Sequence, residues 1–310
     1  MNIVRNVYLR RKAVFCTLSS SAIRFLPRLN WHADVLIIDE AAQCTEPAVW
    51  AAIVGTKRCI LVGDPAQLPA VVKSDKAISS GLQVSLMERL MKEFSNGNVG
   101  IMLDEQYRSN DAIVRWSSES FYDAKLRSHE SVANQRLSDR YFVDKDSILD
   151  SPILLINTDF KSNRSREQFS HRSCYNRDEV EVIVKYVNLL LRANVPPQDI
   201  AVIAPYFAQV EELRKAIKNE SVAVNSVDAF QGQEREVVIF STVRDNKQGY
   251  LGFLREERRL NVAITRAKRQ FVMIGSVKTI CSDENLSSFY RYLLERKSVY
   301  DPAEVFASFF

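Results

Sequence analysis

The stretch Val35-Leu36-Ile37-Ile38-Asp39-Glu40-Ala41-Ala42 decides the fold class of this chain. Four apolar residues in a row predict a short strand that is buried on both faces, as in a parallel sheet covered by helices. Two carboxylates follow where the strand ends. Ligands of open α/β sheets bind at the carboxyl ends of the strands, so we expect Asp39 and Glu40 to face a site. Taken alone, the two acids fit an ordinary surface pair equally well.

The composition favours two globular domains. The chain has 310 residues, of which 46% are hydrophobic and 26% charged, as is typical of soluble proteins. No apolar run reaches the length of a membrane span, and there is no signal-peptide pattern. The five cysteines show no CxxC and no paired spacing. We therefore expect free thiols and an intracellular protein of the nucleus or cytoplasm.

Positive charge is concentrated in two segments, although the net charge is only +4. Residues 1–33 contain six Lys or Arg and no acid, and residues 244–269 contain eight against three acids. Such stripes can follow a phosphate backbone, whereas most charge runs are solvated surface. Charge alone therefore leaves nucleic-acid binding as one of two interpretations.

Apolar strands alternate with amphipathic helices along most of the chain, which predicts parallel sheets. Further strands are expected at 13–16, 57–62, 153–156, 200–204, 222–227, 237–243 and 271–274. Helices are expected at 82–94, 210–217 and 260–267, and a longer one between Asn176, its N-cap, and Asn194. Residues 127–150 lack a clear period, so we expect an irregular connection there.

Polar clusters follow or precede several of these strands, and each one alone has an ordinary interpretation. Hydroxyls in the Thr-Leu-Ser-Ser-Ser segment at 17–21 can hold phosphate oxygens or cap a helix. Gly232 suits a turn, and Arg266 suits the surface of an amphipathic helix. The other clusters are 63–69, 104–110, 226–234, 241–244 and 261–269.

In their order and wording, these clusters resemble superfamily 1 helicases, in the group of the nonsense-mediated-decay, senataxin-like and immunoglobulin-mu-binding helicases. The matching strings are VLIIDEAAQCTEP (35–47), ILVGDPAQLPAVV (60–72), LDEQYRSN (103–110), VNSVDAFQGQEREVVIFSTVR (224–244) and LNVAITRAK (260–268). They cover nearly the whole chain. The resemblance implies an α/β protein with two RecA-like P-loop-type domains, residues 1–105 and 106–310, with ATP bound in the cleft between them.

The resemblance also implies the roles of three residues in the first domain. Asp39 would hold Mg²⁺, and Glu40 would polarise the water that attacks ATP. Gln67 would sense the γ-phosphate and couple it to domain movement.

Five residues of the second domain would complete the nucleotide site by the same resemblance. Tyr107 would stack on the adenine, and Arg108 would reach the γ-phosphate. Arg266 would supply a second guanidinium across the cleft, because charge building on the phosphoryl group needs such donors. Glu234, which follows Gly232, would approach the sugar or a phosphate.

The resemblance further implies a path for single-stranded RNA or DNA across both domains. Its contacts would go mainly to phosphate and sugar, so little sequence preference is expected. The matching positions are Thr17, Ser19, Pro205, Tyr206, Ser226, Asp228 and Arg244.

One family motif, the phosphate-binding loop GxxxxGK[ST], is absent from the 310 residues, since none of the nine glycines is followed by lysine. We therefore expect the C-terminal part of a helicase, with a first sheet that is incomplete at its N-terminus. That sheet should expose strand edges and apolar surface, and ATP turnover by this chain alone should be weak. An in-frame phosphate loop upstream of residue 1 in the gene would favour the enzyme.

The resemblance thus implies an ATP-dependent RNA or DNA helicase that uses ATP and Mg²⁺, with single-stranded nucleic acid and ribonucleoproteins as partners. The alternative is a non-hydrolysing nucleic-acid-binding or scaffold remnant of a helicase. The joint presence of Asp39, Glu40, Gln67, Arg108 and Arg266 argues against that remnant, because a binder needs none of them. A nucleotide-dependent oxidoreductase fits poorly, because the chain contains no GxGxxG.

Overall fold

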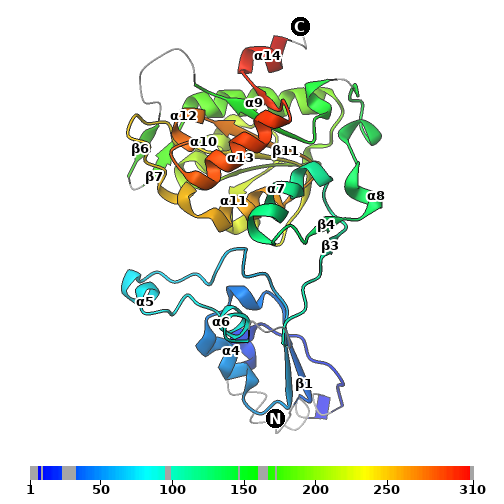
Figure 1. The fold of residues 1–310 in the computed structure, drawn as a ribbon, viewed down its shortest axis with the longest axis vertical. Helices are drawn as coiled ribbons and strands as arrows, with labels where there is room; N and C mark the ends of the chain where they lie inside the picture. Colours follow the sequence, from blue (N-terminus) through cyan, green and yellow to red (C-terminus); the bar gives the residue numbers. More distant parts are fainter. Residues whose placement is uncertain are drawn as a thin grey trace. The chain divides into compact units, whose positions relative to one another are not determined.

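The computed structural model of the chain describes residues 6–7, 10–22, 33–94, 99–145, 147–159, 167–171 and 173–307. These residues form two compact units, unit 1 (residues 1–102) and unit 2 (residues 103–310) (Figure 1). Each unit contains a parallel sheet of its own. None of the described helices is both long enough and apolar enough to cross a membrane.

Unit 1 is built on two parallel strands, β1 (Val35–Ile38) and β2 (Arg58–Leu61), which pair from Val35↔Arg58 to Ile38↔Leu61. Among its described residues, Ile38, Ala41, Val49 and Leu86 form the buried core cluster. The helices that lie wholly within the described residues of unit 1 are α2 (Leu18–Ala22), η1 (Ala41–Gln43), α4 (Glu46–Ile53), α5 (Asp75–Ser79) and α6 (Leu86–Glu93).

The expectation that the first strand is buried on both faces is wrong. Ile38 is 5% exposed, whereas Val35 and Ile37 are 44% and 64% exposed. Side chains alternate between the faces of a strand, and only the face that carries Leu36 and Ile38 packs against the core of unit 1. The other face exposes apolar side chains, Ile37 and Ile60 among them, as expected for this sheet.

The strand expected at residues 13–16 is also absent. These residues have no regular structure, and Phe15 is 95% exposed. In the described part of unit 1 the sheet contains β1 and β2, and residues 13–16 pair with neither strand.

Unit 2 contains a six-stranded sheet in the order β12-β5-β11-β10-β8-β9, in which all neighbouring strands are parallel. The predicted α/β class with parallel sheets is therefore confirmed. The strands are β5 (Ile153–Asn157), β8 (Ile200–Ala204), β9 (Ala223–Ser226), β10 (Arg235–Ser241), β11 (Ala267–Gly275) and β12 (Val299–Tyr300).

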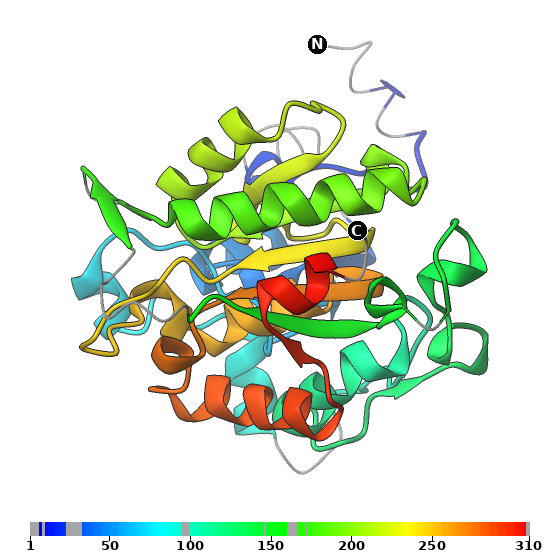
Figure 2. The ribbon, with the colours of Figure 1, turned by 90° about the horizontal axis from the view of Figure 1, so that it is seen from above.

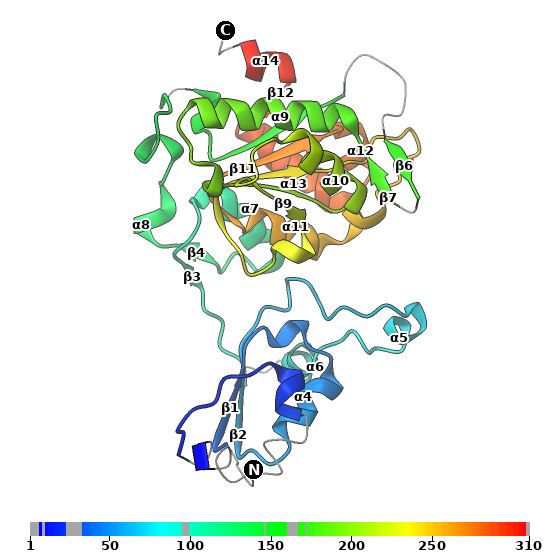
Figure 3. The same ribbon diagram turned by 180° about the vertical axis from the view of Figure 1, so that it is seen from behind.

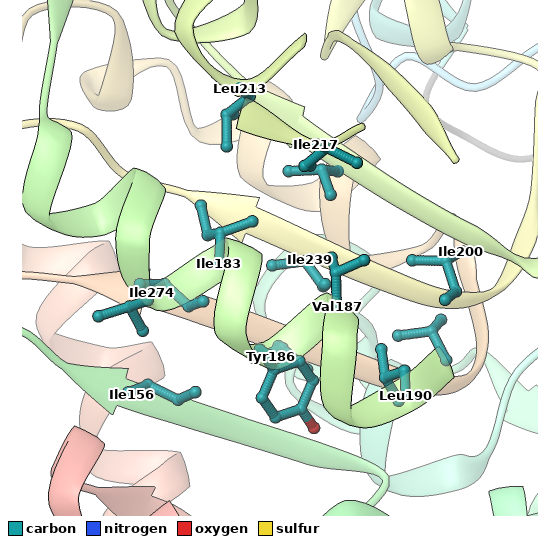
Figure 4. Close-up of a cluster of buried hydrophobic side chains, with 14 of the residues drawn as sticks. Ile156, Ile183, Tyr186, Val187, Leu190, Ile200, Leu213, Ile217, Ile239 and Ile274 are labelled. Atoms are coloured by element: carbon teal, nitrogen blue, oxygen red, sulfur yellow. The ribbon is translucent and has the colours of Figure 1, made fainter. Parts of the chain in front are cut away.

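Helices cover both faces of this sheet. Helices α9 (Arg177–Arg192) and α10 (Phe207–Ala216) lie on one face, and α13 (Glu284–Glu295) lies on the other (Figure 2). On the first face, Ile183, Tyr186 and Val187 of α9 pack on Ile239 and Ile274 of the sheet (Figure 4). The remaining helices are α7 (Asp111–Phe121), α8 (Glu130–Ala133), α11 (Glu257–Ile264), α12 (Val277–Ile280), α14 (Pro302–Ala307) and the short η2 (Leu137–Asp139), η3 (Ile148–Asp150), η4 (Pro197–Asp199), η5 (Asp228–Phe230) and η6 (Gly252–Arg255).

Two small sheets flank the large one. Strands β3 (Glu105–Gln106) and β4 (Arg127–Ser128) are parallel, whereas β6 (Gln168–Ser170) and β7 (Ser173–Tyr175) form an antiparallel pair. The second pair lies beside α10 (Figure 3), where the Ala208 amide donates to Ser173 Oγ at 3.0 Å.

The sequence predicts the start of α9 correctly but not the end of α11. The Asn176 side chain caps α9 by accepting hydrogen bonds from the Asp178 and Glu179 amides, as predicted. The helix expected at 260–267 ends at Ile264, because Ala267 already pairs with Arg235 of β10. Arg266 therefore lies outside the helix and is only 4% exposed, which excludes the interpretation as a surface arginine.

Candidate functional sites

Asp39 and Glu40 occupy the carboxyl end of β1, and both are exposed. The Glu40 amide donates to Asp39 Oδ1 at 2.9 Å, and Gln43 Nε2 donates to Glu40 Oε2 at 2.6 Å. Glu40 has a φ of 53°, a left-handed conformation that non-glycine residues seldom adopt and that is common at functional sites. This turn leads directly into η1, whose alanines are buried.

The loop after β2 lies against the same edge of the sheet. A Cβ atom added at Gly63 would lie 3.0 Å from the backbone nitrogens of Ala41 and Ala42, so a larger residue would crowd this close approach. In the loop, Asp64 Oδ2 accepts a hydrogen bond from Gln67 Nε2 at 2.8 Å. Parallel pairing thus brings Gln67 to the edge that carries Asp39 and Glu40, together with Asp64, which the sequence analysis did not single out.

Thr17 and Ser19 are both exposed at the start of α2. Thr17 Oγ1 lies 2.8 Å from Ser20 Oγ and accepts a weak hydrogen bond from the Ser20 amide at 3.4 Å. The geometry is that of a helix cap, the ordinary interpretation of this segment.

Unit 2 gathers three charged residues from distant segments at the amino-terminal edge of its sheet. Arg108 Nε donates to Glu234 Oε2 at 2.5 Å, and Lys268 Nζ lies 2.8 Å from Glu234 Oε1. These two contacts, from Lys268 first and then Arg108, hold the pKa of Glu234 below its usual value. The side chains are 31% to 40% exposed, so the cluster carries a net positive charge within reach of an anion.

Arg266 and Gly232 lie near this cluster. Arg108 donates to the Thr265 carbonyl at 3.2 Å, next to Arg266. Arg266 itself donates to the Val262 carbonyl at 3.1 Å and to Thr265 Oγ1 at 3.0 Å. Gly232 has a φ of 76°, which favours glycine and supports its interpretation as a turn residue.

Tyr107 is 61% exposed beside Arg108. Its hydroxyl donates to Glu105 Oε2 at 2.7 Å, and this hydrogen bond raises the pKa of Tyr107. Its ring stacks on His129 with centroids 4.4 Å apart. His129 and Lys268 were missed by sequence reasoning because their partners are distant along the chain.

The opposite, carboxyl-terminal edge of the sheet carries the residues expected to bind nucleic acid. Pro205 and Tyr206 follow β8, and Arg244 follows β10. Arg244 Nη1 donates to Tyr206 Oη at 3.2 Å, and its other nitrogens donate to Glu167 at 2.8 and 3.0 Å. Tyr206 and Arg244 are 5% and 9% exposed, so the structure brings them together but buries both.

Ser226 and Asp228 lie at the end of β9, at the same edge. Ser226 Oγ accepts a hydrogen bond from the Ala229 amide at 3.3 Å, and Asp228 accepts one from Arg259 at 3.4 Å. Both side chains are therefore already used within unit 2.

Behind Arg244 lies Glu179, which is fully buried and was not anticipated from the sequence. It accepts hydrogen bonds from Ser241 Oγ at 2.5 Å and from the Val243 amide at 2.9 Å. Burial raises the pKa of Glu179 to about 8, although these hydrogen bonds act in the opposite direction. The carboxyl group thus fixes the segment that positions Arg244.

Comparison with known proteins identifies the class. A family model described as an AAA domain matches residues 82–278, and a second model with the same description matches residues 1–75. The chain belongs to this family, in the superfamily 1 helicase group that its motif strings resemble.

Its relatives include proteins named as helicases. DNA-binding protein SMUBP-2 of Mesocricetus auratus is 39% identical over 91% of this chain and 28% of its own length. DNA polymerase alpha-associated DNA helicase A of Saccharomyces cerevisiae is 34% identical over 96% of this chain and 47% of its own length. Helicase sen1 of Schizosaccharomyces pombe is 35% identical over 95% of this chain and 18% of its own length. The chain therefore spans less than half of these relatives.

Proposed function

We propose that this chain forms part of an ATP-dependent nucleic-acid helicase or translocase. The observation that carries the proposal is the cluster of Arg108, Glu234 and Lys268, which joins three motif strings of the family within unit 2. Two cations around one carboxylate leave a net positive charge that attracts a phosphate group. Guanidinium groups also stabilise the transition state of phosphoryl transfer.

The acids of unit 1 fit a role with Mg²⁺. Among the described residues there is no cluster of three or more side chains that would form a closed metal cage. Mg²⁺ is commonly held by one or two carboxylates together with the phosphates of the substrate, which suits the exposed carboxylate of Asp39. When bound, the ion would neutralise charge on the phosphates. Glu40 would polarise the attacking water, and Gln67 would sense the γ-phosphate.

Single-stranded RNA or DNA would follow the carboxyl-terminal edge of the sheet in unit 2. Exposed cations continue this edge beyond Arg244, among them Lys247 and Arg255. Contacts of this kind reach phosphates and give a strong dependence on salt.

A binding experiment tests this part of the proposal. Fluorescence anisotropy with single-stranded RNA and DNA oligonucleotides of the same length should show affinity that falls with salt. The pair Lys247→Ala and Arg255→Ala should together lower the slope of log K against log salt by about 1 to 2. Arg291→Ala, at an exposed position of α13, serves as a charge control and should leave the slope unchanged. No binding to either oligonucleotide at low salt would refute the proposal.

Hydrolysis by the 310-residue chain itself should be slow. The sequence has no GxxxxGK[ST], so these residues supply neither its amide cradle nor its lysine for the β- and γ-phosphates. We expect turnover close to the uncatalysed background, with and without RNA. A turnover that RNA stimulates and that Glu40→Gln abolishes would show that this expectation is wrong.

A further inference from the structure

Two short strands bring Tyr107 and His129 together across 22 residues of chain. Strands β3 and β4 are parallel with Glu105↔Arg127 and Gln106↔Ser128 in register. The His129 amide donates to the Gln106 carbonyl at 3.0 Å and continues this pairing. Tyr107 and His129 are therefore the next residues along two paired strands, which explains why their side chains meet.

The two rings form a stack. Their centroids are 4.4 Å apart and their planes are inclined by 28°. His129 is held in turn, because its Nδ1 accepts a hydrogen bond from the Ser131 amide at 3.2 Å and caps the short helix α8. Since Nδ1 accepts this hydrogen bond, the neutral ring carries its proton on Nε2.

Tyr107 is thus restrained at two points. Its hydroxyl donates to Glu105 Oε2 at 2.7 Å, and one face of its ring lies on His129. Of the described side chains, only His129 stacks on this ring. A tyrosine that is still 61% exposed after these contacts has a large area left for another flat group.

We propose that His129 is a positioning residue of a base-stacking site, where its imidazole covers one face of Tyr107 and presents the other face to the purine base of a nucleotide. The inference rests on the proposed nucleotide site and adds the residue that orients its aromatic ring. Arg108 follows Tyr107 directly in the chain, and its cluster with Glu234 and Lys268 would supply the charge for the phosphates of the same ligand.

The physical reason is pre-organisation. An exposed tyrosine samples several rotamers, and a ligand must immobilise the side chain when it binds, which weakens its affinity. A ring that is already stacked and hydrogen-bonded avoids this loss. Stacking requires an aromatic group at position 129, whereas capping of α8 requires only a side chain with a hydrogen-bond acceptor.

Stacking and capping have different requirements, so variants of His129 can test whether it positions Tyr107 or only caps α8. His129→Asn keeps a good helix cap and removes the ring, whereas His129→Phe keeps the ring and removes the cap. ATP and inorganic tripolyphosphate are titrated into the 310-residue chain and followed by NMR, which measures weak affinities. We expect His129→Asn to weaken ATP binding by about fivefold and His129→Phe to retain it within about twofold. Neither variant should change the affinity for tripolyphosphate, which has no base.

The outcomes separate this inference from the proposed function. Suppose that the wild-type chain binds ATP, and that His129→Asn binds ATP equally well or His129→Phe binds it more weakly than His129→Asn. Either result overturns the positioning role of His129 and leaves the proposed function standing. If the wild-type chain binds ATP no more tightly than tripolyphosphate, no base site exists and the inference fails, whereas the proposed function is refuted only by the absence of oligonucleotide binding. Tyr107→Ala is the reference for complete loss of stacking, and adding His129→Asn to it should cause no further loss.

Discussion

Glu179 is a carboxyl group enclosed at the start of α9, with four hydrogen-bond donors around it. Besides Ser241 and Val243, it accepts hydrogen bonds from Thr242 Oγ1 at 3.3 Å and Asn176 Nδ2 at 3.5 Å. Val243 has a φ of 69°, which is rare for a β-branched residue. The hydrogen bond from its amide to Glu179 stabilises this strained turn, and Arg244 follows it directly.

The raised pKa of Glu179 gives a prediction about pH. The pKa rises from the ordinary 4.5 to about 8 on folding, so the folded chain holds this proton more tightly than the unfolded chain. The stabilisation is complete below about pH 4.5 and is lost as the pH rises through 8. Glu179→Gln should remove this contribution, which amounts to at most about 1.4 kcal/mol per pH unit. Urea unfolding of unit 2 between pH 5 and 9 measures how the free energy of unfolding depends on pH. An equal dependence in the wild type and in Glu179→Gln would contradict the assignment.

The sequence predicted the site residues that belong to motif strings, but it did not predict the residues that contact them and fix their positions. Lys268 was quoted within a string without a role, and His129 lay in a segment expected to be irregular. Glu167 binds Arg244 from 77 residues away. These contacts depend on strand pairing and loop packing between distant segments, and no local period or spacing encodes them.

The limits of sequence reasoning are clearest where two strands share one pattern. Val35–Ile38 and Ile153–Ile156 are both runs of four aliphatic residues. All four residues of the second run are at most 1% exposed, whereas Ile37 in the first is 64% exposed. Strand β5 lies between β12 and β11 with helices on both faces of the sheet, whereas β1 pairs with β2 and packs on one face. The run predicts a strand, but the layers around it decide the burial.

Helix α9 offers a test at the level of one element. Asn176 is 1% exposed, caps the helix and also donates to the Val243 carbonyl at 3.3 Å. Asn176→Ala should destabilise unit 2 by about 2 kcal/mol, the upper range for an N-cap, because the Val243 carbonyl also loses a partner. Faster hydrogen exchange at the Asp178 and Glu179 amides would show that the N-cap has been lost. The matched control is Ser74→Ala, which removes the cap of α5, and its effect should be confined to that five-residue helix. Unchanged exchange in α9 would contradict the role of Asn176.

The two units differ in the size of their cores. Among the described residues, the core cluster of unit 1 contains four buried residues, whereas one face of the sheet in unit 2 alone carries a cluster that includes α9, α10 and five strands. Hydrophobic stabilisation grows with the apolar area removed from water. We therefore expect unit 1 to unfold at lower urea than unit 2, in a separate transition visible by hydrogen exchange. A single transition that covers both units would contradict this expectation.

The exposed face of the sheet in unit 1 should drive self-association, since Val35, Ile37 and Ile60 all lie on it and are exposed. Ile37→Thr keeps a β-branched side chain and removes apolar surface, so it should reduce light scattering by the 310-residue chain at high concentration. Its effect on unfolding should stay within about 0.5 kcal/mol because the site is exposed. The neighbouring Ile38→Thr makes the same chemical change on the buried face and should cost about 2 kcal/mol or more. If Ile37→Thr destabilises unit 1 as much as Ile38→Thr does, that face is covered in solution, and the association would need another cause.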